Sequence, residues 1–233
     1  MTIRDVGEYK KLLCDGSFVG SLPDAAVDTL LIQGRISHAE RGDTVFSKGD
    51  EGDSLLLVLR GRLKVSNLAA DGGEVVLGFL VEGDVIGEIA ALDGRGRTAT
   101  VTALEKSSFL GIYRSQLLPL LLSHPTALLE VVEVLCDRLR GANAIAEDGL
   151  YDMRQRAARG LLRLAEKHGR RINGKVVIDL NLNQRDLGNF LRLSRENTNR
   201  QLSSLRAKHV VDVENAIITI LDEPALRQMA GDD

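Results

Sequence analysis

The apolar residues of this chain change their spacing once, near His124-Pro125. Upstream of that point, short runs rich in Val, Leu, Ile and Phe alternate with Gly-Asp and Gly-Glu dipeptides. Short strands joined by tight turns at this spacing are typical of an antiparallel barrel or jelly roll. We therefore expect a β domain over residues 1–123, with one helix near its start that Pro23-Asp24 opens and Gly34 closes.

Downstream of Pro125, the apolar residues recur at steps of three and four, which predicts a helix about three heptads long. One arrangement lays this helix against the β domain of its own chain, and another pairs it with a second copy of itself as a coiled coil. The two arrangements are compatible because they can use different faces. We assign residues 124–150 to a central dimerisation helix, whose apolar positions are Leu128, Val132, Leu135, Leu139, Ala142 and Ala146.

The charge of the chain is distributed unevenly. Between Met153 and Val210 there are 14 Lys and Arg but 4 Asp and Glu, a local charge of +10 in a chain of 233 residues whose net charge is −3. The rest of the chain therefore carries −13. A basic segment in an acidic protein is expected of a module that contacts phosphate. Charge alone would favour a solvated surface without a partner. The motif inside the segment therefore has to distinguish such a surface from a phosphate-binding module.

Two short amphipathic helices are predicted within this basic segment. Leu187, Phe190 and Leu191 mark the inner face of the first helix, and Ser194 is a suitable N-cap for the second. The turn between them is short, as a helix-turn-helix requires. Charged side chains face outward at the start of the second helix, where a recognition helix touches base edges: Arg195, Glu196 and Arg200.

Short strands surround this pair of helices. Asn173-Gly174 is a hairpin signal, and residues 210–221 are predicted to form two strands around Glu214-Asn215. A helix pair with hairpin strands on both sides, in a segment of this charge, favours a winged helix-turn-helix that binds double-stranded DNA. We assign that domain to residues 151–233.

A second motif lies in the β domain, at residues 87–100. It combines Gly87, the acid Glu88, a short apolar turn, a Gly-rich loop and Arg97 followed by small residues. Small residues let backbone N–H groups approach an anion, and a guanidinium presents a planar fork to phosphate. A carboxylate within reach can accept a hydrogen bond from a sugar hydroxyl. Burying Arg97 and Glu88 would be costly without such a ligand or each other, so a structural pairing of the two is the rival interpretation.

This motif resembles the phosphate-binding cassette of cyclic-nucleotide-binding domains. The resemblance implies that Glu88 holds the ribose 2′-hydroxyl, that Arg97 holds the cyclic phosphate, and that the central helix contributes to the purine pocket. Thr98 resembles cassettes that favour cyclic GMP, so the implied effector is cyclic AMP or cyclic GMP. The implied site residues are Gly87, Glu88, Ile89, Ala90, Arg97, Thr98, Ala99, Arg138, Ala142 and Asn143.

The pattern Ser-Arg-Glu-x-x-x-Arg that begins at Ser194 resembles the recognition helix of the cyclic-AMP receptor protein/FNR superfamily of bacterial transcription factors. The resemblance spans nearly the whole chain. It implies a TGTGA-like half-site, and Arg can indeed pair with guanine and Glu with cytosine. Arg192 stands where the family often has Gly, and Asn197 where it usually has Thr. The implied DNA-binding residues are Arg185, Ser194, Arg195, Glu196, Asn197, Thr198 and Arg200.

The sequence argues against several other classes of protein. The two cysteines, Cys14 and Cys136, exclude a disulfide framework and a four-cysteine cluster. The four histidines are scattered, and no catalytic motif is recognised. No apolar run approaches the roughly 20 residues that span a bilayer, and the N-terminal residues do not resemble an export signal. We therefore expect no metal, no catalysis, no membrane partner and a cytoplasmic location.

Together these patterns predict an α+β chain with an N-terminal antiparallel β-barrel or jelly roll, a long dimerisation helix and a C-terminal winged helix-turn-helix. The expected function is that of a homodimeric transcription regulator, controlled allosterically by a cyclic nucleotide, with double-stranded DNA and RNA polymerase as partners. Two alternatives remain open. One is a family regulator with a vestigial pocket that binds DNA constitutively or senses another effector. The other is a nucleotide-sensing regulatory subunit that does not bind DNA.

Overall fold

The structure is a computed structural model, and it describes residues 7, 9–11, 18–70 and 72–231. Cys14 lies outside the described residues. The chain forms two compact units, Met1–Asn67 with Leu77–Ala142 and Leu68–Val76 with Asn143–Asp233. The long central helix is therefore shared, with its residues from Asn143 onward in the second unit.

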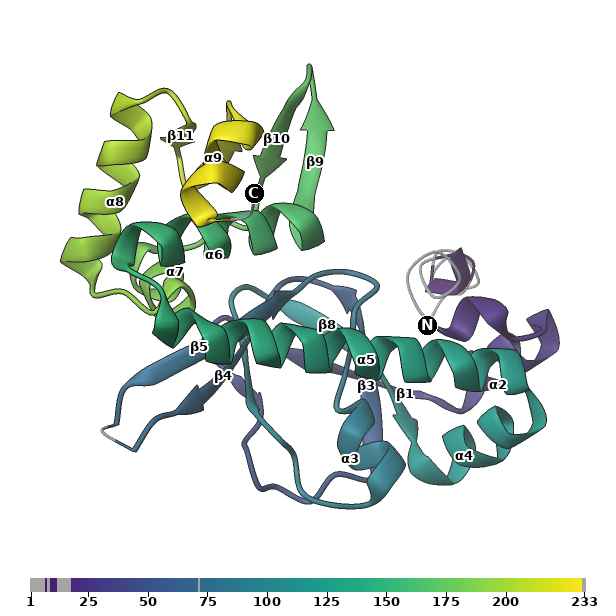
Figure 1. Cartoon of the computed structure of the whole chain (residues 1–233). Helices are drawn as coiled ribbons and strands as arrows, with labels where there is room; N and C mark the ends of the chain where they lie inside the picture. The colour runs from purple at the N-terminus through teal and green to yellow at the C-terminus, as the bar shows by residue number, and fades with distance from the viewer. Residues whose placement is uncertain (1–6, 8, 12–17, 71, 232–233) are drawn as a thin grey trace. The chain divides into compact units, whose positions relative to one another are not determined.

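Two four-stranded antiparallel sheets dominate the N-terminal part of the chain (Figure 1). The first has the order β1-β8-β3-β6 and consists of β1 (Arg35–Ala39), β8 (Ser107–Tyr113), β3 (Ser54–Arg60) and β6 (Val85–Ile86). The second has the order β2-β7-β4-β5 and consists of β2 (Thr44–Phe46), β7 (Thr100–Ala103), β4 (Leu63–Leu68) and β5 (Glu74–Leu80). Strands that are distant in sequence are neighbours in both sheets, as in a jelly roll.

Side chains alternate along β3 between two hydrophobic clusters. Leu55, Leu57 and Leu59 belong to one cluster, and Val58 belongs to the other. The Val58 cluster draws on both sheets and forms the interior of the jelly roll, with Leu63, Val65, Leu80, Val101, Ala103 and Phe109 among its members. The register of β3 against β8 places Val58 opposite Phe109 and Leu57 opposite Leu110, so both strands divide their side chains in the same way.

Helices complete the cluster that contains Leu55, Leu57 and Leu59, against the outer face of the first sheet. They are η1 (Phe18–Ser21), α2 (Asp24–Gln33), α4 (Arg114–Ser123) and the N-terminal part of α5 (Pro125–Glu147). Their buried side chains include Leu30, Leu31, Leu117, Leu121, Ala127 and Val131. Gly34 ends α2 by donating its N–H to the carbonyl of Leu30 at 2.8 Å. The two helices predicted in this part of the sequence, at 24–33 and after His124-Pro125, are confirmed.

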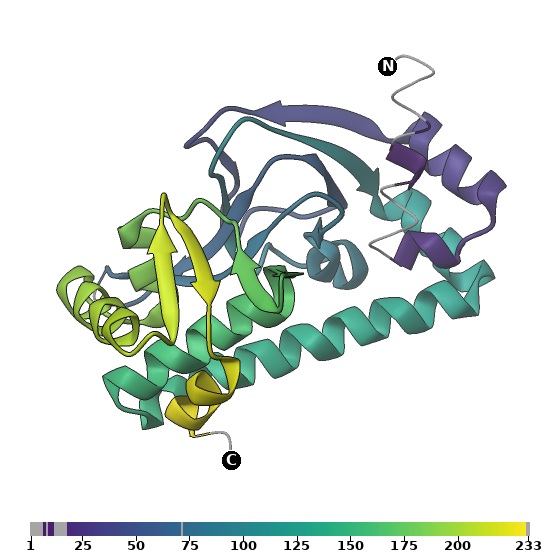
Figure 2. The ribbon, with the colours of Figure 1, turned by 90° about the horizontal axis from the view of Figure 1, so that it is seen from above.

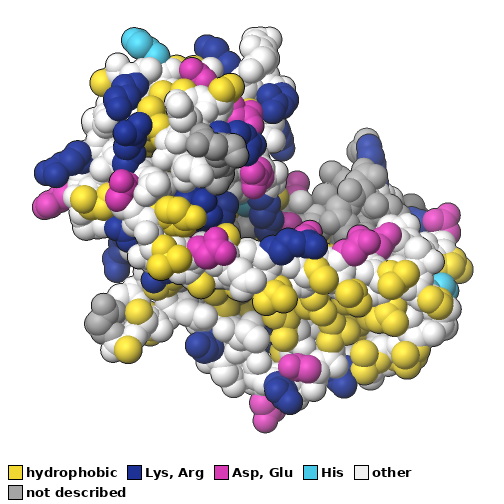
Figure 3. Space-filling model, viewed as in Figure 1, with side chains coloured by type: hydrophobic (Ala, Val, Ile, Leu, Met, Phe, Trp, Pro, Cys, Tyr) yellow, Lys and Arg dark blue, Asp and Glu magenta, His cyan; other side chains and the backbone are white. Residues whose placement is uncertain are grey.

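One face of α5 stays exposed and is rich in apolar side chains, which form the yellow band over this helix and α4 in Figure 3. Leu129, Val132 and Leu139 are exposed by 64%, 46% and 63%. The buried face uses Ala127 and Val131 instead, and Leu135 is partly buried against the same core. The apolar positions predicted from the sequence therefore come from two different faces of the helix.

The second unit contains a helix-turn-helix that is flanked in the sequence by two strand hairpins, which join in one sheet (Figure 2). Its helices are η2 (Asp148–Leu150), α6 (Met153–His168), α7 (Gln184–Leu191), α8 (Arg195–Ala207) and α9 (Glu223–Ala230). Its sheet has the order β11-β12-β10-β9 and consists of β11 (Val211–Glu214), β12 (Ile217–Ile220), β10 (Lys175–Ile178) and β9 (Gly169–Ile172).

Both predicted hairpins are present. Asn173 and Gly174 join β9 to β10 with φ angles of 50° and 77°, as a two-residue hairpin turn requires. Asn215 and Ala216 join β11 to β12 with φ angles of 50° and 63°. The predicted inner faces of the two helices are also confirmed, since Leu187, Phe190, Leu191, Leu202 and Leu205 are all buried.

A glycine allows α6 to approach α7 closely. A Cβ on Gly160 would collide with the side chain of Leu191, so a larger residue would push the two helices apart. The predicted α+β fold, with an antiparallel jelly roll, a long helix and a winged helix-turn-helix, is confirmed.

Candidate functional site

The motif at residues 87–100 forms a short helix bounded by two glycines. Gly87 precedes α3 (Glu88–Asp93) with φ 84°, and Gly94 follows it with φ 74°. Both angles lie in the left-handed region, which glycine adopts without strain. A Cβ on Gly87 would also collide with Nη1 of Arg97. Arg114 closes the other end of the helix by donating from Nη1 to the carbonyls of Ala91, at 2.6 Å, and Leu92.

Glu88 is buried at the start of this helix and is paired with the long helix α5. Its side chain is 4% exposed, and Oε1 lies 2.6 Å from Nε of Arg138. Arg138 also donates from Nη2 to the carbonyl of Val85 at 2.7 Å. The resemblance implied a helix arginine near this glutamate, and the structure brings the two together. The carboxylate therefore pairs with Arg138 and not with Arg97, unlike the structural pairing considered from the sequence.

Arg97 is also buried, and its guanidinium is held by the backbone. Nη1 donates to the carbonyls of Ser54 at 2.6 Å and Gly87 at 3.0 Å, and Nη2 donates to Oγ of Ser54 at 3.4 Å. The guanidinium lies over the ring of Phe46, 4.4 Å from its centroid. Burial lowers the pKa of Arg97 below its ordinary value, although the negative charges of Asp53, Glu88 and Asp50 oppose that shift.

Two buried polar atoms in this cassette have no hydrogen-bond partner in the described part of the chain. They are Oε2 of Glu88, an acceptor, and Nε of Arg97, a donor. Gly52 packs close to the second of these atoms, since a Cβ there would collide with Ala90 and lie 3.1 Å from Nε of Arg97. Phe46, Gly52 and Ser54 were not among the predicted site residues. Phe46 and Ser54 lie on β2 and β3, so their role follows from strand pairing, which no local pattern predicts.

The other residues of the predicted nucleotide site differ in their surroundings. Ala90 and Ala99 are buried, and Ile89 is half-buried. Thr98 is exposed, and its carbonyl accepts from Nδ2 of Asn67 at 3.3 Å. Ala142 and Asn143 are both exposed on α5. Their predicted contribution to the purine pocket stays a prediction.

The predicted recognition helix is α8. Oγ of Ser194 accepts from the N–H of Asn197 at 3.2 Å, which confirms the predicted N-cap. Arg195, Glu196 and Arg200 are exposed, as is Arg185 at the start of α7, and Asn197 is half-buried. Asn199 is exposed as well and lies on the same helix between Glu196 and Arg200. Asn199 was not among the predicted DNA-binding residues.

The structure corrects the prediction for Thr198. Its side chain is fully buried, at 0% exposure, and its Oγ1 donates to the carbonyl of Ser194 at 2.9 Å. A Cβ on Gly188 would lie 3.1 Å from the same hydroxyl, so Thr198 packs against α7. A side chain in this position supports the helix pair and does not reach DNA.

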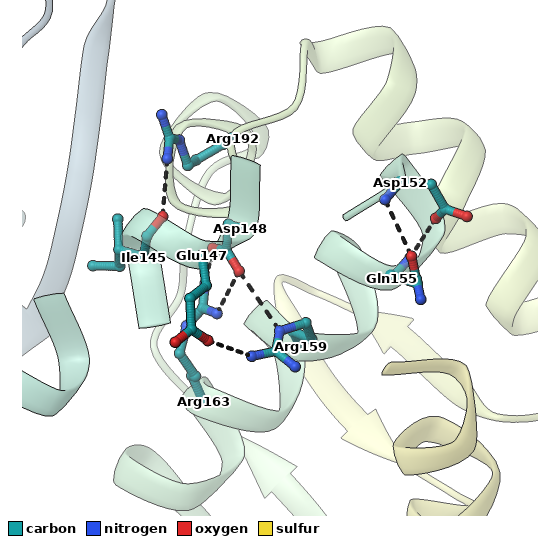
Figure 4. Close-up of polar contacts among 8 residues, drawn as sticks. All are labelled: Ile145, Glu147, Asp148, Asp152, Gln155, Arg159, Arg163 and Arg192. Atoms are coloured by element: carbon teal, nitrogen blue, oxygen red, sulfur yellow. Dashed lines mark hydrogen bonds and ion pairs between the residues drawn. The ribbon is translucent and has the colours of Figure 1, made fainter. Parts of the chain in front are cut away.

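Buried ion pairs fix the connection between α5 and α6 (Figure 4). Asp148 is 1% exposed, and its two carboxylate oxygens accept from Nη1 and Nη2 of Arg163 at 3.0 and 2.7 Å. Arg159 lies farther away, with Nε 3.9 Å from Asp148 and Nη2 3.6 Å from Glu147. The guanidinium of Arg159 lies 4.2 Å from the ring centroid of Tyr151. None of these ion pairs was predicted from the sequence.

Figure 4 also shows the start of α6, where Asp152 and Gln155 form a capping box. Oδ1 of Asp152 accepts from the N–H of Gln155 at 2.8 Å, and Oε1 of Gln155 accepts from the N–H of Asp152 at 3.2 Å. Two backbone donors at the helix start are satisfied in this way. α6 therefore begins at a well-defined residue.

Comparisons with known protein families assign both parts of the chain. Residues 36–124 match the cyclic nucleotide-binding domain, and residues 155–229 match the Crp-like helix-turn-helix domain. The fold and the two domains define a transcription regulator with a nucleotide-binding domain and a DNA-binding domain. The chain belongs to the cyclic-AMP receptor protein/FNR superfamily.

Individual relatives come from more than one branch of this family. The chain is 28% identical over 216 residues to the CRP-like cAMP-activated global transcriptional regulator of Mycobacterium tuberculosis, covering 92% of this chain and 96% of that protein. It is 26% identical over 193 residues to the fumarate and nitrate reduction regulatory protein of Escherichia coli, covering 82% and 77%. The structure of FixK2 from Bradyrhizobium japonicum shares the fold, with a TM-score of 0.74, 19% identity and coverage of 84% and 96%.

No three His, Cys, Asp or Glu side chains in residues 18–70 and 72–231 are grouped so that they could hold a metal ion. Within the described chain, no single helix has the length and apolar content needed to cross a membrane. α4 and the helix that starts at Pro125 reach those values as a pair, with a bend of 116° between them.

Proposed function

We propose that a cyclic nucleotide, cyclic AMP or cyclic GMP, binds at this cassette and controls the affinity of the protein for DNA. The supporting observation is the pair of buried atoms without partners, Oε2 of Glu88 and Nε of Arg97. Each buried polar group without a hydrogen-bond partner lowers the stability of the folded state by about 1–3 kcal/mol. A ligand with a sugar hydroxyl beside an anionic phosphate offers a donor to the first atom and an acceptor to the second, so the residues present fit such a ligand.

In this proposal, the chain's own residues hold the ligand by charge and position. Arg138 orients the carboxylate of Glu88, and the carbonyls of Ser54 and Gly87 orient the guanidinium of Arg97. The phosphate of a bound nucleotide would meet a buried positive charge, and charge-assisted hydrogen bonds of this kind are the strong ones. Asn143 would contact the base, because its amide both donates and accepts.

The DNA-binding part of the proposal concerns α8. Arg195, Glu196 and Arg200 are exposed near the capped start of this helix. Arg can pair bidentately with guanine and Glu can accept from cytosine, so we propose a TGTGA-like half-site. RNA polymerase is the expected partner at the promoter, and the cytoplasm is the expected location of a regulator that acts on DNA there.

The exposed face of α5 supports a homodimer. Exposed residues recur along it at alternating steps of three and four: Leu129, Val132, Cys136, Leu139, Asn143 and Ala146, which we call the α5 stripe. This spacing is that of a coiled-coil seam, and an apolar seam without a partner favours pairing with another helix of the same kind. A parallel pair would present two recognition helices to a palindrome, about 34 Å apart.

The effector is the open part of this proposal, because the relatives include both a cAMP-activated regulator and a fumarate and nitrate reduction regulator. A regulator that binds DNA constitutively, or that senses another effector, is the second candidate. Calorimetric titration with cyclic AMP and with cyclic GMP distinguishes the two. Saturable binding of one nucleotide supports the first candidate. Absence of binding, together with salt-dependent affinity for a TGTGA palindrome, supports the second.

The native Cys136 tests the proposed helix pairing. In a Cys14→Ser background, a parallel in-register pair places Cys136 opposite its copy, so mild copper-catalysed oxidation by oxygen should convert the two thiols to an interchain disulfide. Asp137→Cys with Cys136→Ser is the matched control, because residue 137 is exposed and points away from the α5 stripe. Equal crosslinking of both variants, or a monomer by sedimentation, would contradict the pairing.

A further inference from the structure

The turn of the helix-turn-helix contains a backbone conformation that favours glycine. Arg192 ends α7 with φ 55° and ψ 42°, in the left-handed region that side chains rarely adopt. Its N–H donates to the carbonyl of Gly188, as does the N–H of Leu193 at 2.9 Å. The turn needs this conformation to finish α7, yet the residue there carries a long charged side chain.

That side chain reaches the end of α5 (Figure 4). Nη1 of Arg192 donates to the carbonyl of Ile145 at 2.9 Å, across 47 residues of sequence. Ile145 lies in the last turn of α5, where helix carbonyls lack partners within the helix. A cation is also favoured there, because the helix dipole places partial negative charge at the C-terminus. Glycine would relieve the strained backbone but could not make this contact.

The same turn is held from α6. Nη1 of Arg156 donates to the carbonyl of Arg192 at 3.2 Å. Arg163, which pairs with Asp148, lies over the ring of Phe190 at 5.5 Å, two residues before Arg192. The end of α5, the start of α6 and the turn are therefore joined by a connected set of polar contacts. The recognition helix α8 begins three residues after Arg192.

We propose that Arg192 is a positioning residue, which clasps the turn of the helix-turn-helix to the C-terminal end of α5. This contact transmits a movement of the end of α5 to the start of α8. It acts in addition to the covalent connection through α6 and α7. The proposal rests on the proposed function, since it assumes that nucleotide and DNA binding are coupled. The proposal explains why arginine occupies position 192, where the family resemblance leads us to expect glycine.

Arg192→Gly separates this role from a purely structural one. If Arg192 served only to complete the turn, glycine would fit better and would leave function intact. If it is a clasp, the variant keeps or raises its unfolding temperature. At the same time, amide hydrogen exchange at residues 143–152 rises, and the factor by which nucleotide raises operator affinity falls by about 2–30-fold.

Two further variants complete the experiment. Asn173→Gly is the matched control, because it relieves a similar left-handed conformation (φ 50°) at the tip of the β9–β10 hairpin. It should leave hydrogen exchange at 143–152 and the coupling factor unchanged. Arg192→Lys keeps a cationic donor on a long side chain, so it should restore part of the coupling that Arg192→Gly loses.

Exchange at residues 143–152 that is identical in Arg192→Gly and wild type would overturn the clasp. Raised exchange with unchanged coupling would overturn its role in passing on the movement. Failure of the proposed function is recognised separately, in the wild-type protein. If nucleotide does not change the operator affinity of the wild-type protein, the coupling factor is one and Arg192 has no positioning role. The exchange data would still show whether the contact between Arg192 and Ile145 exists.

Discussion

Nε of Arg138 lies 2.6 Å from Oε1 of Glu88, which links the long helix α5 directly to the first residue of the cassette helix α3. The carboxylate is almost fully buried, whereas the arginine side chain is 30% exposed. Removing one partner of a buried pair is costly, because the other charge is left uncompensated. Anything that changes the position of Glu88 must therefore also change its contact with α5.

Arg138→Met should lower both stability and nucleotide affinity. We expect a loss of about 1–3 kcal/mol in the free energy of unfolding, less than for a fully buried pair because water screens the exposed part of Arg138. Denaturant titration measures this loss, and calorimetry measures the affinity. Arg140→Met is the control, since Arg140 is exposed and pairs with Asp137 on the helix surface. Equal effects of the two substitutions would show that the contact with Glu88 has no special role.

Arg97→Ala should weaken nucleotide binding by about 2–5 kcal/mol, because the phosphate loses a charge-assisted partner in a buried site. Arg95→Ala, at an exposed position in the same loop, should bind normally. Calorimetry on both variants and the wild type provides the comparison. Nucleotide binding by Arg97→Ala with wild-type affinity would place the phosphate elsewhere.

Arg195→Ala should cost about 1–3 kcal/mol on the best operator and relax the preference at one guanine. Its affinity for random duplex should fall only slightly. Arg170→Ala removes an equal charge from the β9–β10 hairpin, so it controls for loss of net charge alone. Fluorescence anisotropy with specific and random duplexes gives the ratio. A wild-type ratio in Arg195→Ala would show that this side chain does not read a base.

Thr198→Val tests the corrected placement of this residue. Loss of the hydrogen bond from Oγ1 to Ser194 should lower the free energy of unfolding by about 0.5–1.5 kcal/mol. Operator affinity of the folded protein should stay unchanged, because the hydroxyl is buried against α7. A change in operator affinity without a change in stability would instead show that the side chain of Thr198 contacts DNA.

Local patterns predicted the parts of the fold that depend on near neighbours in sequence. Asn173-Gly174 and Ser194 were placed correctly because a hairpin turn and an N-cap need specific residues at specific backbone angles. Thr198 was misplaced although a signal was available. It lies four residues before Leu202 and seven before Leu205, and therefore on the inner face of α8.

Contacts between distant residues were harder to predict. The pairing of Arg138 with Glu88 was expected only from the family resemblance, because the two residues are 50 positions apart. The pairing of Asp148 with Arg163 was missed, since it depends on how η2 turns the chain between α5 and α6. The strain at Arg192 was foreseen as a departure from glycine, but its contact with Ile145 follows from the fold alone.

The central claim is that nucleotide binding at the cassette and DNA binding at α8 are energetically coupled. Coupling is reciprocal, so operator must raise nucleotide affinity by the same factor by which nucleotide raises operator affinity. The most direct measurement is a nucleotide titration by calorimetry, with and without a saturating TGTGA palindrome, on the wild-type protein. We predict that operator tightens nucleotide binding by about 5–150-fold, the usual range of such couplings. Tight nucleotide binding that is identical with and without operator would contradict the account.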